Sequence, residues 1–221
     1  MTDRANIKEI FTSIQGEGPY VGHKQLFIRF CGCNLDCKYC DTDYDAKGSK
    51  SYTAEEILEE IEKHSDCHSV SITGGEPLLN TGFLKELLPQ CQLPVYLETN
   101  ATLSGEVGEI IDYIDYVAAD IKLPSCTGLN GYWKEHDAFF AKVGRKELFA
   151  KIVFDENITE EEISKSAKLG AKYGIELILQ PKFSASTNFD VKFAERTLNR
   201  FLEKYKKVRL IPQVHKFLEV R

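Results

Sequence analysis

Short runs of apolar and β-branched residues alternate with amphipathic stretches along almost the whole chain. Strands are predicted at 25–30, 69–73, 94–99, 116–122, 148–154, 175–180 and 207–214. Helices are predicted between them, at 53–64, 81–90, 105–114, 159–174 and 190–206. Two of these helices begin at a capping box, in which Thr53 is followed by Glu56 and Thr159 by Glu162. Strands that alternate with helices indicate an α/β fold with a parallel sheet and right-handed crossovers.

The predicted strands carry few polar positions, which is typical of a sheet covered on both faces. A barrel or partial barrel fits this pattern, and so does a doubly wound sheet. In either architecture, functional sites gather at the carboxyl ends of the strands. The chain has 221 residues, 43% of them hydrophobic, which is enough for one sizeable core and predicts one domain.

Composition narrows the functional classes. The formal net charge of -6 argues against a nucleic-acid-binding protein that relies on a broad basic surface, but it leaves room for a small anionic or pterin-like ligand. No apolar run is long enough to span a bilayer, so no membrane partner is expected. The first ten residues, MTDRANIKEI, lack the apolar core of a signal peptide. We therefore expect a cytoplasmic protein, in which disulfides are disfavoured.

A group of cysteines follows the first predicted strand. Cys33, Cys37 and Cys40 have the spacing C-x3-C-x2-C. A structural zinc site normally uses four ligands in two separated pairs, and no second Cys/His pair follows at such a spacing. Three thiolates on one loop suit a four-iron cluster in which one iron has no protein ligand. A zinc site or a set of unconnected thiols stays open as the alternative.

The other cysteines are widely spaced and lie in apolar surroundings. They are Cys31, Cys67, Cys91 and Cys126. We expect them to be buried structural thiols, because a free cysteine packs as a small apolar side chain.

A second motif, Gly74-Gly75-Glu76-Pro77, ends the strand predicted at 69–73. Two glycines allow the backbone to approach a ligand closely, and exposed backbone groups at a strand end can hold an amino group. Taken alone, the same four residues also suit an ordinary turn between a strand and a helix.

The two motifs together resemble the radical S-adenosylmethionine (SAM) superfamily. The resemblance implies a partial (β/α) TIM-type barrel with a radical SAM core. It also implies a [4Fe-4S] cluster whose open iron binds SAM, and reductive cleavage of SAM to a 5′-deoxyadenosyl radical. Residues 1–221 are then one domain, with a short substrate-capping segment at the N-terminus and a tail at the C-terminus.

The two ends of the chain, 10–30 and 211–221, resemble the 7-carboxy-7-deazaguanine synthase family, chiefly through Gln15-Gly16-Glu17-Gly18. The resemblance implies a lyase of queuosine and deazapurine biosynthesis that converts 6-carboxytetrahydropterin to 7-carboxy-7-deazaguanine and releases ammonia. It further implies Mg²⁺, an electron donor such as flavodoxin, and a homodimer.

Site residues follow from this resemblance. Those implied to bind SAM are Tyr39, Cys40, Asp41, Gly75, Asp120, Ile121, Lys122 and Gln180. Those implied to bind the pterin are Ile14, Gln15, Gly16, Glu17, Arg29, Thr73, His215 and Arg221. The implied metal ligands are Cys33, Cys37 and Cys40 for the cluster and Thr42 for Mg²⁺. No residue is assigned as a catalytic acid or base.

Several alternatives remain at this stage. Asp120-Ile121-Lys122 departs from the Ser-Pro-Lys of many family members, which puts the role of Asp120 in doubt. The stretch 41–45 is also a plausible polar turn, and 213–221 a last strand with a frayed end. A glycyl-radical activase, or an iron-sulfur or zinc protein without catalytic activity, are the competing functions.

Overall fold

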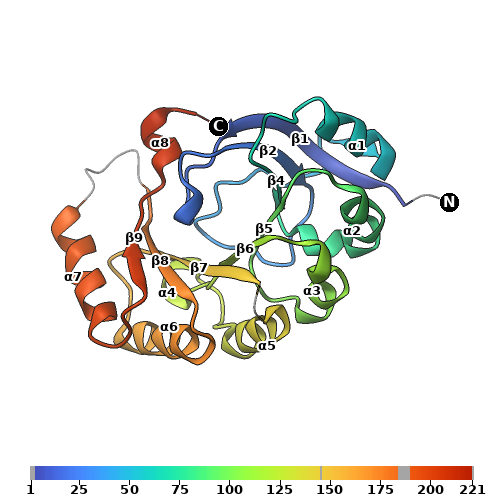
Figure 1. Cartoon of the computed structure of the whole chain (residues 1–221). Coiled ribbons are helices and arrows are strands. Elements are labelled where there is room, and N and C mark those ends of the chain that lie inside the picture. The colour runs from blue at the N-terminus through green and yellow to red at the C-terminus, as the bar shows by residue number, and fades with distance from the viewer. Residues whose placement is uncertain (1–2, 145, 184–189, 221) are drawn as a thin grey trace.

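The computed structural model describes residues 3–144, 146–183 and 190–220. Within these ranges, nine strands form one sheet in the order β3-β1-β2-β4-β5-β6-β7-β8-β9. The strands are β1 (Ala5–Ile14), β2 (Lys24–Phe30), β3 (Lys50–Tyr52), β4 (Ser69–Gly74), β5 (Val95–Thr99), β6 (Tyr116–Asp120), β7 (Glu147–Phe154), β8 (Glu176–Pro181) and β9 (Val208–Leu210). The sheet curves around a central space (Figure 1).

The strand order decides between the two architectures that the sequence leaves open. From β2 to β9 along the sheet, each strand pairs in parallel with its neighbour. A doubly wound sheet requires the order to reverse at a switch point, and this sheet has no such reversal in its parallel part. β1 and β3 extend the parallel part by antiparallel pairing. The expected partial (β/α) barrel is therefore confirmed.

Helices cover the outer side of the sheet, as Figure 1 shows for α1, α2, α3, α5, α6 and α7. The α-helices are α1 (Ala54–Glu62), α2 (Thr81–Leu87), α3 (Ser104–Ile110), α4 (Pro124–Thr127), α5 (Trp133–Val143), α6 (Glu160–Tyr173), α7 (Val191–Leu202) and α8 (Val214–Leu218). Short 3-10 turns are η1 (Gly18–Tyr20), η2 (Pro77–Asn80), η3 (Leu88–Gln90) and η4 (Ile111–Tyr113). Both predicted capping boxes are present, at the start of α1 and of α6.

Alternate residues of each strand face the helices and the inside of the barrel, because side chains alternate along a strand. The outward set, for example Ile72, Leu97 and Ile152, belongs to the main core between the sheet and the helices. A separate apolar cluster of Tyr96, Ala118, Phe149 and Ile178 lies apart from it.

The loop after β1 closes the base of the barrel. Tyr20 of η1 inserts its ring among those of Tyr96, Tyr116 and Phe149, with centroids 5.6, 4.7 and 6.3 Å away. Gly18 allows this close approach, because a Cβ atom there would lie 2.6 Å from the Phe149 ring. Aromatic rings therefore fill one end of the barrel.

The end of the chain differs from its predicted structure. Only Val208–Leu210 of the strand predicted at 207–214 is extended, and a short helix, α8, begins at Val214. Pro212 lacks the backbone N–H that a continuing strand would need. The tail runs back toward the start of the chain, where Val214 N donates to Gly16 O at 2.9 Å.

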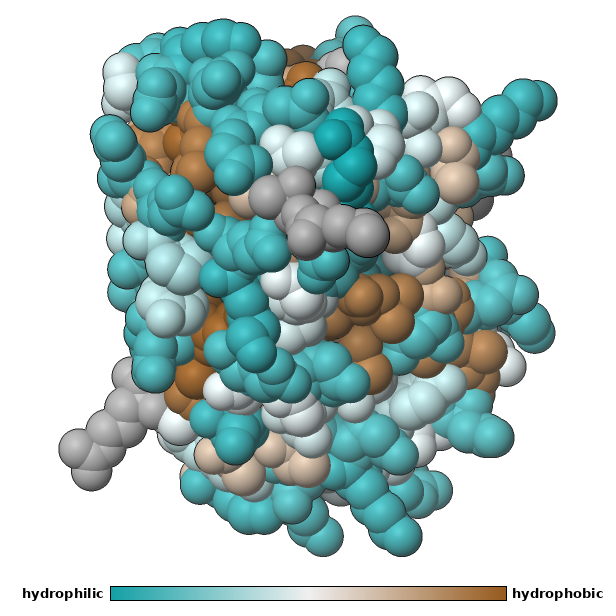
Figure 2. All heavy atoms as spheres, turned by 90° about the vertical axis from the view of Figure 1, so that its right-hand side faces the viewer, coloured by the Kyte–Doolittle hydropathy of each residue, from teal (hydrophilic) through white to brown (hydrophobic). Residues whose placement is uncertain are grey.

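Figure 2 shows the face that lies on the right in Figure 1. Hydrophilic side chains cover most of it, and apolar patches appear between them. This distribution is typical of amphipathic helices whose apolar sides pack against a sheet. None of the helices in the described ranges is both long enough and apolar enough to cross a membrane.

Candidate active site

A cavity of about 430 Å³ opens at the carboxyl ends of the parallel strands. Its walls bring together nearly all the site residues named from the sequence. Those that line it are Ile14, Gln15, Gly16, Glu17, Arg29, Cys33, Cys37, Tyr39, Cys40, Asp41, Thr42, Thr73, Gly75, Asp120, Lys122, Gln180 and His215. Ile121 does not line it, since its side chain is buried in the main core. Arg221 lies outside the described residues.

The three motif cysteines lie in the loop between β2 and β3 and face the same cavity. Burial raises the pKa of the Cys33 and Cys37 thiols, and the neighbouring thiols add to the effect. A ligand that needs thiolates must therefore supply positive charge in return. In the described ranges, no three His, Cys, Asp or Glu side chains are arranged to hold a single metal ion. Three thiols of one loop that line a single cavity suit a four-iron cluster with one iron left open to a ligand.

The four other cysteines lie away from this cavity. Cys67 and Cys126 are buried, as expected for structural thiols. Cys31 and Cys91 are only partly buried, so full burial was wrong for these two. Cys31 immediately follows β2, where the chain leaves the sheet to enter the cysteine loop.

The glycine pair at the end of β4 lets this strand pass directly beneath the cysteine loop. Gly74 has a φ of +128°, which strongly favours glycine. A Cβ atom on Gly75 would lie 1.9 Å from Gly32 O. Glu76 N donates to the same Gly32 oxygen at 2.8 Å. Any larger residue at 75 would push the cysteine loop away from the sheet.

Glu76 is fully buried and its carboxylate is surrounded by donors. Thr99 Oγ1 donates at 2.9 Å, Asn100 N at 2.8 Å and Leu78 N at 3.1 Å. Burial raises the pKa of Glu76 to about 7, although these hydrogen bonds oppose the shift. The carboxylate ties the end of β4 to the end of β5.

Asn100, the residue directly after β5, extends this hydrogen-bond network to the cysteine loop. Its Nδ2 donates to Asn34 Oδ1 at 2.8 Å and lies 4.0 Å from Cys33 Sγ. His136 Nε2 lies 3.3 Å from Asn100 O and 3.1 Å from Asp120 O. Burial lowers the pKa of His136 to about 4, so the neutral ring joins the ends of β5 and β6.

Beyond the cysteines, a cation and a carboxylate meet at the end of β6. Lys122 Nζ lies 2.8 Å from Asp120 Oδ2 and 3.3 Å from Tyr39 O–H. Burial lowers the pKa of Lys122, but the charge of Asp120 outweighs it and holds the pKa well above its ordinary value. Asp120 Oδ1 is buried without a hydrogen-bond partner in the described residues. This oxygen is an acceptor that a ligand hydroxyl can fill.

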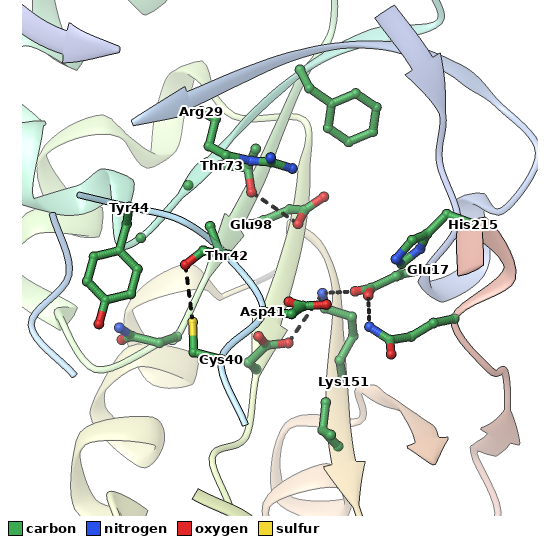
Figure 3. A pocket seen from close by; sticks show the side chains of 18 of the residues that line it. Glu17, Arg29, Cys40, Asp41, Thr42, Tyr44, Thr73, Glu98, Lys151 and His215 are labelled. Carbon is green, nitrogen blue, oxygen red and sulfur yellow. Dashed lines mark hydrogen bonds and ion pairs between the residues drawn. The ribbon is translucent and has the colours of Figure 1, made fainter. Parts of the chain in front are cut away.

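The loop after β1 directs Glu17 into the same cavity, where it meets Lys151 (Figure 3). Lys151 Nζ donates to Glu17 Oε2 at 2.6 Å, and Gln180 and Gln213 donate to Oε1 at 3.0 and 2.9 Å. Burial alone would raise the pKa of Glu17, but Lys151 and the hydrogen bond from Gln213 hold it at about 2. The side chain of Gln15, in the same loop, donates from Nε2 to Gln25 Oε1 and to Glu98 Oε1.

Arg29 of β2 and Glu98 of β5 line another part of the cavity (Figure 3). Thr73 lies on β4, the strand between these two. Arg29 forms an ion pair with Glu9, its register partner on β1, and its guanidinium lies 5.2 Å from the centroid of the Phe11 ring. Thr73 Oγ1 donates to Glu98 Oε2 at 3.2 Å. Arg29, its partner Glu9 and the carboxylate of Glu98 thus all line the cavity.

The tail helix α8 contributes His215 and Lys216 to the cavity wall. Lys216 Nζ lies 2.9 Å from Asp41 Oδ2, and Asp43 Oδ2 lies 2.7 Å from Lys8 Nζ. Both carboxylates beside Thr42 are therefore paired with lysines. Burial lowers the pKa of His215, which packs against Gly16.

Sequence reasoning missed four residues that the geometry makes prominent: Glu98, Asn100, Lys151 and Gln213 line the cavity. Three of them interrupt or follow apolar strands. A polar residue at an inward position near a strand's carboxyl end is the signal that marks them. Gln213 carries no such signal, because it follows β9 and reaches the cavity only through the turn at Pro212.

The chain is similar in sequence and fold to known radical SAM proteins. Residues 27–127 match the family model described as "Radical SAM superfamily". A 7-carboxy-7-deazaguanine synthase from Archaeoglobus fulgidus is 38% identical, with 99% of this chain and 100% of the relative covered. The enzyme of the same name from Geobacter sulfurreducens is 34% identical, with 97% of each chain covered. The crystal structure of QueE from Escherichia coli matches with a TM-score of 0.67 at 20% identity, covering 96% of this chain and 95% of that one.

Proposed function

Because this chain belongs to the 7-carboxy-7-deazaguanine synthase family of the radical SAM superfamily, we propose that it converts 6-carboxytetrahydropterin to 7-carboxy-7-deazaguanine and releases ammonia. One observation carries the choice of substrate: a single cavity places the guanidinium of Arg29 and the carboxylates of Glu17 and Glu98 around the same space. A pterin with a carboxylate at one end and a guanidine-like edge at the other matches that arrangement of charges.

Arg29 is proposed to bind the substrate carboxylate. A guanidinium has five N–H donors, so the ion pair with Glu9 leaves donors for a second carboxylate. Thr73, on the neighbouring strand, is proposed to contact the pterin near Arg29. Glu17 and Glu98 are proposed to accept from the guanidine-like edge. The backbone of Ile14, Gln15 and Gly16 would then border the ring.

The [4Fe-4S] cluster is proposed to be held by Cys33, Cys37 and Cys40. Bound together, the cluster and SAM supply a carbon radical that abstracts hydrogen from the substrate. Asp120 Oδ1, which has no hydrogen bond but lies 3.4 Å from Lys151 Nζ, would accept from a SAM ribose hydroxyl, and the other side-chain oxygen is held by Lys122. Gly75 would present backbone to the amino-acid part of SAM. Tyr39, Asp41, Ile121 and Gln180 complete this proposed subsite.

Mg²⁺ is proposed to bind through Thr42. The two neighbouring carboxylates, Asp41 and Asp43, are paired with lysines, so the Thr42 hydroxyl is the group of this stretch left to face the cavity. Mg²⁺ retains waters and accepts few protein ligands, which suits one hydroxyl together with substrate oxygens. His215 and Arg221 are proposed to complete the substrate side of the mouth.

The remaining proposals concern the whole protein. Residues 1–221 are proposed to form one domain that works as a homodimer in the cytoplasm and receives electrons from a donor such as flavodoxin. Exposed Phe183 and Phe217, whose rings lie 6.3 Å apart, support an apolar contact with a second protein. Sedimentation equilibrium measures the oligomeric state.

An anaerobic assay tests the proposed reaction. The protein is reconstituted with iron and sulfide and mixed with SAM, Mg²⁺, a reductant and 6-carboxytetrahydropterin, and products are identified by mass spectrometry. Cys37→Ala should abolish product, whereas Cys91→Ala, which removes a thiol away from the cavity, should retain it. If 5′-deoxyadenosine forms without 7-carboxy-7-deazaguanine, the substrate assignment is wrong and the radical chemistry stands.

A further inference from the structure

Lys151 is the one lysine at the centre of β7, and its side chain is almost completely buried inside the barrel. Its Nζ lies 2.6 Å from Glu17 Oε2 and 3.4 Å from Asp120 Oδ1. Asp120 is its register partner on the adjacent parallel strand, so both side chains point to the same face of the sheet. A single ammonium therefore contacts one carboxylate from the loop after β1 and one from β6.

The four charges form a continuous row across the cavity floor. Lys122 contacts Asp120, Asp120 contacts Lys151, and Lys151 contacts Glu17. Positive and negative charges alternate along the row, so the two ammonium groups balance the two carboxylates. The Lys122 end lies beside Tyr39 and the cysteine loop, and the Glu17 end lies in the loop after β1. The row thus connects the SAM side of the cavity with the substrate side.

The two contacts of Lys151 are unequal. Its distance to Glu17 is that of a charge-assisted hydrogen bond, whereas the contact with Asp120 is longer and leaves Asp120 Oδ1 without a hydrogen bond. An ammonium that is drawn away from Glu17 has Asp120 as its next acceptor. Burial lowers the pKa of Lys151, but Asp120 and Glu17 outweigh it, so the side chain keeps its charge in either position.

We propose that Lys151 is a positioning residue that couples the two ligand sites, by moving its hydrogen bond from Glu17 to Asp120 when the substrate occupies Glu17. With Glu17 engaged by donors of the substrate, Lys151 fixes Asp120 for the SAM ribose. Substrate binding therefore strengthens SAM binding, and SAM strengthens substrate binding by the same factor, because coupling is reciprocal. The identity of the substrate rests on the proposed function, but the charge row does not.

Glu17→Gln tests the coupling without any substrate. The neutral amide cannot hold Lys151 as an ion pair, so the variant imitates the substrate-bound arrangement. SAM affinity is measured by equilibrium dialysis on the reconstituted, unreduced protein. We expect E17Q to bind SAM more tightly than the unaltered protein, by roughly fivefold or more. In the Lys151→Met background, E17Q should no longer change SAM affinity.

Lys168→Met is the matched control, because Lys168 is exposed on the outer helix α6. It should leave the response to E17Q intact. Asp120→Asn removes the other carboxylate that Lys151 contacts, so E17Q should not change SAM affinity in this background either. This variant keeps the test decisive if K151M folds poorly. Folding and cluster content are checked by circular dichroism and iron analysis.

Two outcomes would overturn the coupling: an unchanged SAM affinity in E17Q, or an equal change with and without Lys151. A separate arm adds 6-carboxytetrahydropterin to the unaltered protein and to K151M. Tighter SAM binding should appear only where Lys151 is present. If the pterin has no effect on either protein while the E17Q response still depends on Lys151, the substrate assignment fails and the coupling stands.

Discussion

Individual residues in this protein often serve two functional motifs at once. Glu76 completes the glycine motif at the end of β4, yet its oxygens accept from Thr99 and Asn100 at the end of β5. Asn100 in turn holds Asn34 of the cysteine loop. Because each buried polar group is satisfied by the next, a change at one position is felt at the cysteine loop.

Glu76→Gln is expected to change how stability depends on pH. The folded protein holds the Glu76 proton up to a pKa of about 7, whereas the unfolded chain releases it near 4.5. Stability from this group is therefore present below pH 4.5 and falls as pH rises through 7, by up to about 3 kcal/mol. The amide of the E76Q variant has no proton to release, so the variant should lack this fall. Urea unfolding of the reduced, cluster-free protein from pH 5 to 8 measures the difference.

The same measurement has a built-in control. E76Q also loses an acceptor for a backbone N–H, and this cost does not vary with pH. Only a difference in how the free energy of unfolding changes with pH reports the titration of Glu76. A constant offset between the curves of the two proteins would show that Glu76 stays ionised from pH 5 to 8. Parallel curves would contradict the raised pKa.

At the scale of elements, the cavity mouth depends on a contact between the first loop and the last helix. Val214 N donates to Gly16 O at 2.9 Å, and Gln213 Nε2 donates to Glu17 Oε1 at 2.9 Å. A Cβ atom on Gly16 would lie 2.5 Å from the backbone and Cβ of His215. Glycine is required here because α8 packs against the bare backbone.

Gly16→Ala is therefore expected to displace α8 and weaken binding of the pterin by tenfold or more, with little effect on SAM. The clash is with backbone as well as side-chain atoms of His215, which a rotamer change cannot relieve. The apparent KM for the pterin and the dialysis affinity for SAM measure the two effects. Gly105→Ala is the control, because a Cβ atom there meets nothing within 4 Å. Equal losses for both ligands in G16A would place the contact outside the substrate site.

At the scale of the whole molecule, the sequence predicts the parallel part of the barrel well. Its strands are apolar on their outer positions, and the predicted helices separate all of them except β6 and β7, so their order leads directly to the topology. The longer helix between β6 and β7, α5, escapes prediction, and its start has no side-chain cap. β1 escapes prediction because charged Lys8 and Glu9 interrupt it, and both are paired across the sheet or with the cysteine loop. α8 escapes because its end of the chain is half-exposed and has little apolar periodicity.

The candidate site is predictable to a different degree. Motifs with fixed spacing, such as Cys33 to Cys40 and Gly74-Gly75, identify themselves because their chemistry is local in sequence. Lys151 and Glu98 act only through partners far along the chain, and the closure of the barrel is what brings them together. The sequence pattern shows only that Lys151 and Glu98 are polar residues within apolar strands. It does not show which carboxylate meets which cation.

Removal of residues 213–221 tests whether the tail completes the barrel for substrate rather than for folding. The tail contributes Gln213 to Glu17 and Lys216 to Asp41, but its side chains are only partly buried. We expect the truncated protein to keep its cluster, its thermal stability within a few degrees, and slow cleavage of SAM without substrate. Turnover of the pterin should fall at least a hundredfold, since one wall of the cavity is lost. Lys216→Ala breaks only the contact with Asp41 and should cause a smaller loss. If the truncated protein turns over the pterin normally, the tail is not part of the substrate site; if its cluster is also lost, the tail supports the cysteine loop through Asp41 instead.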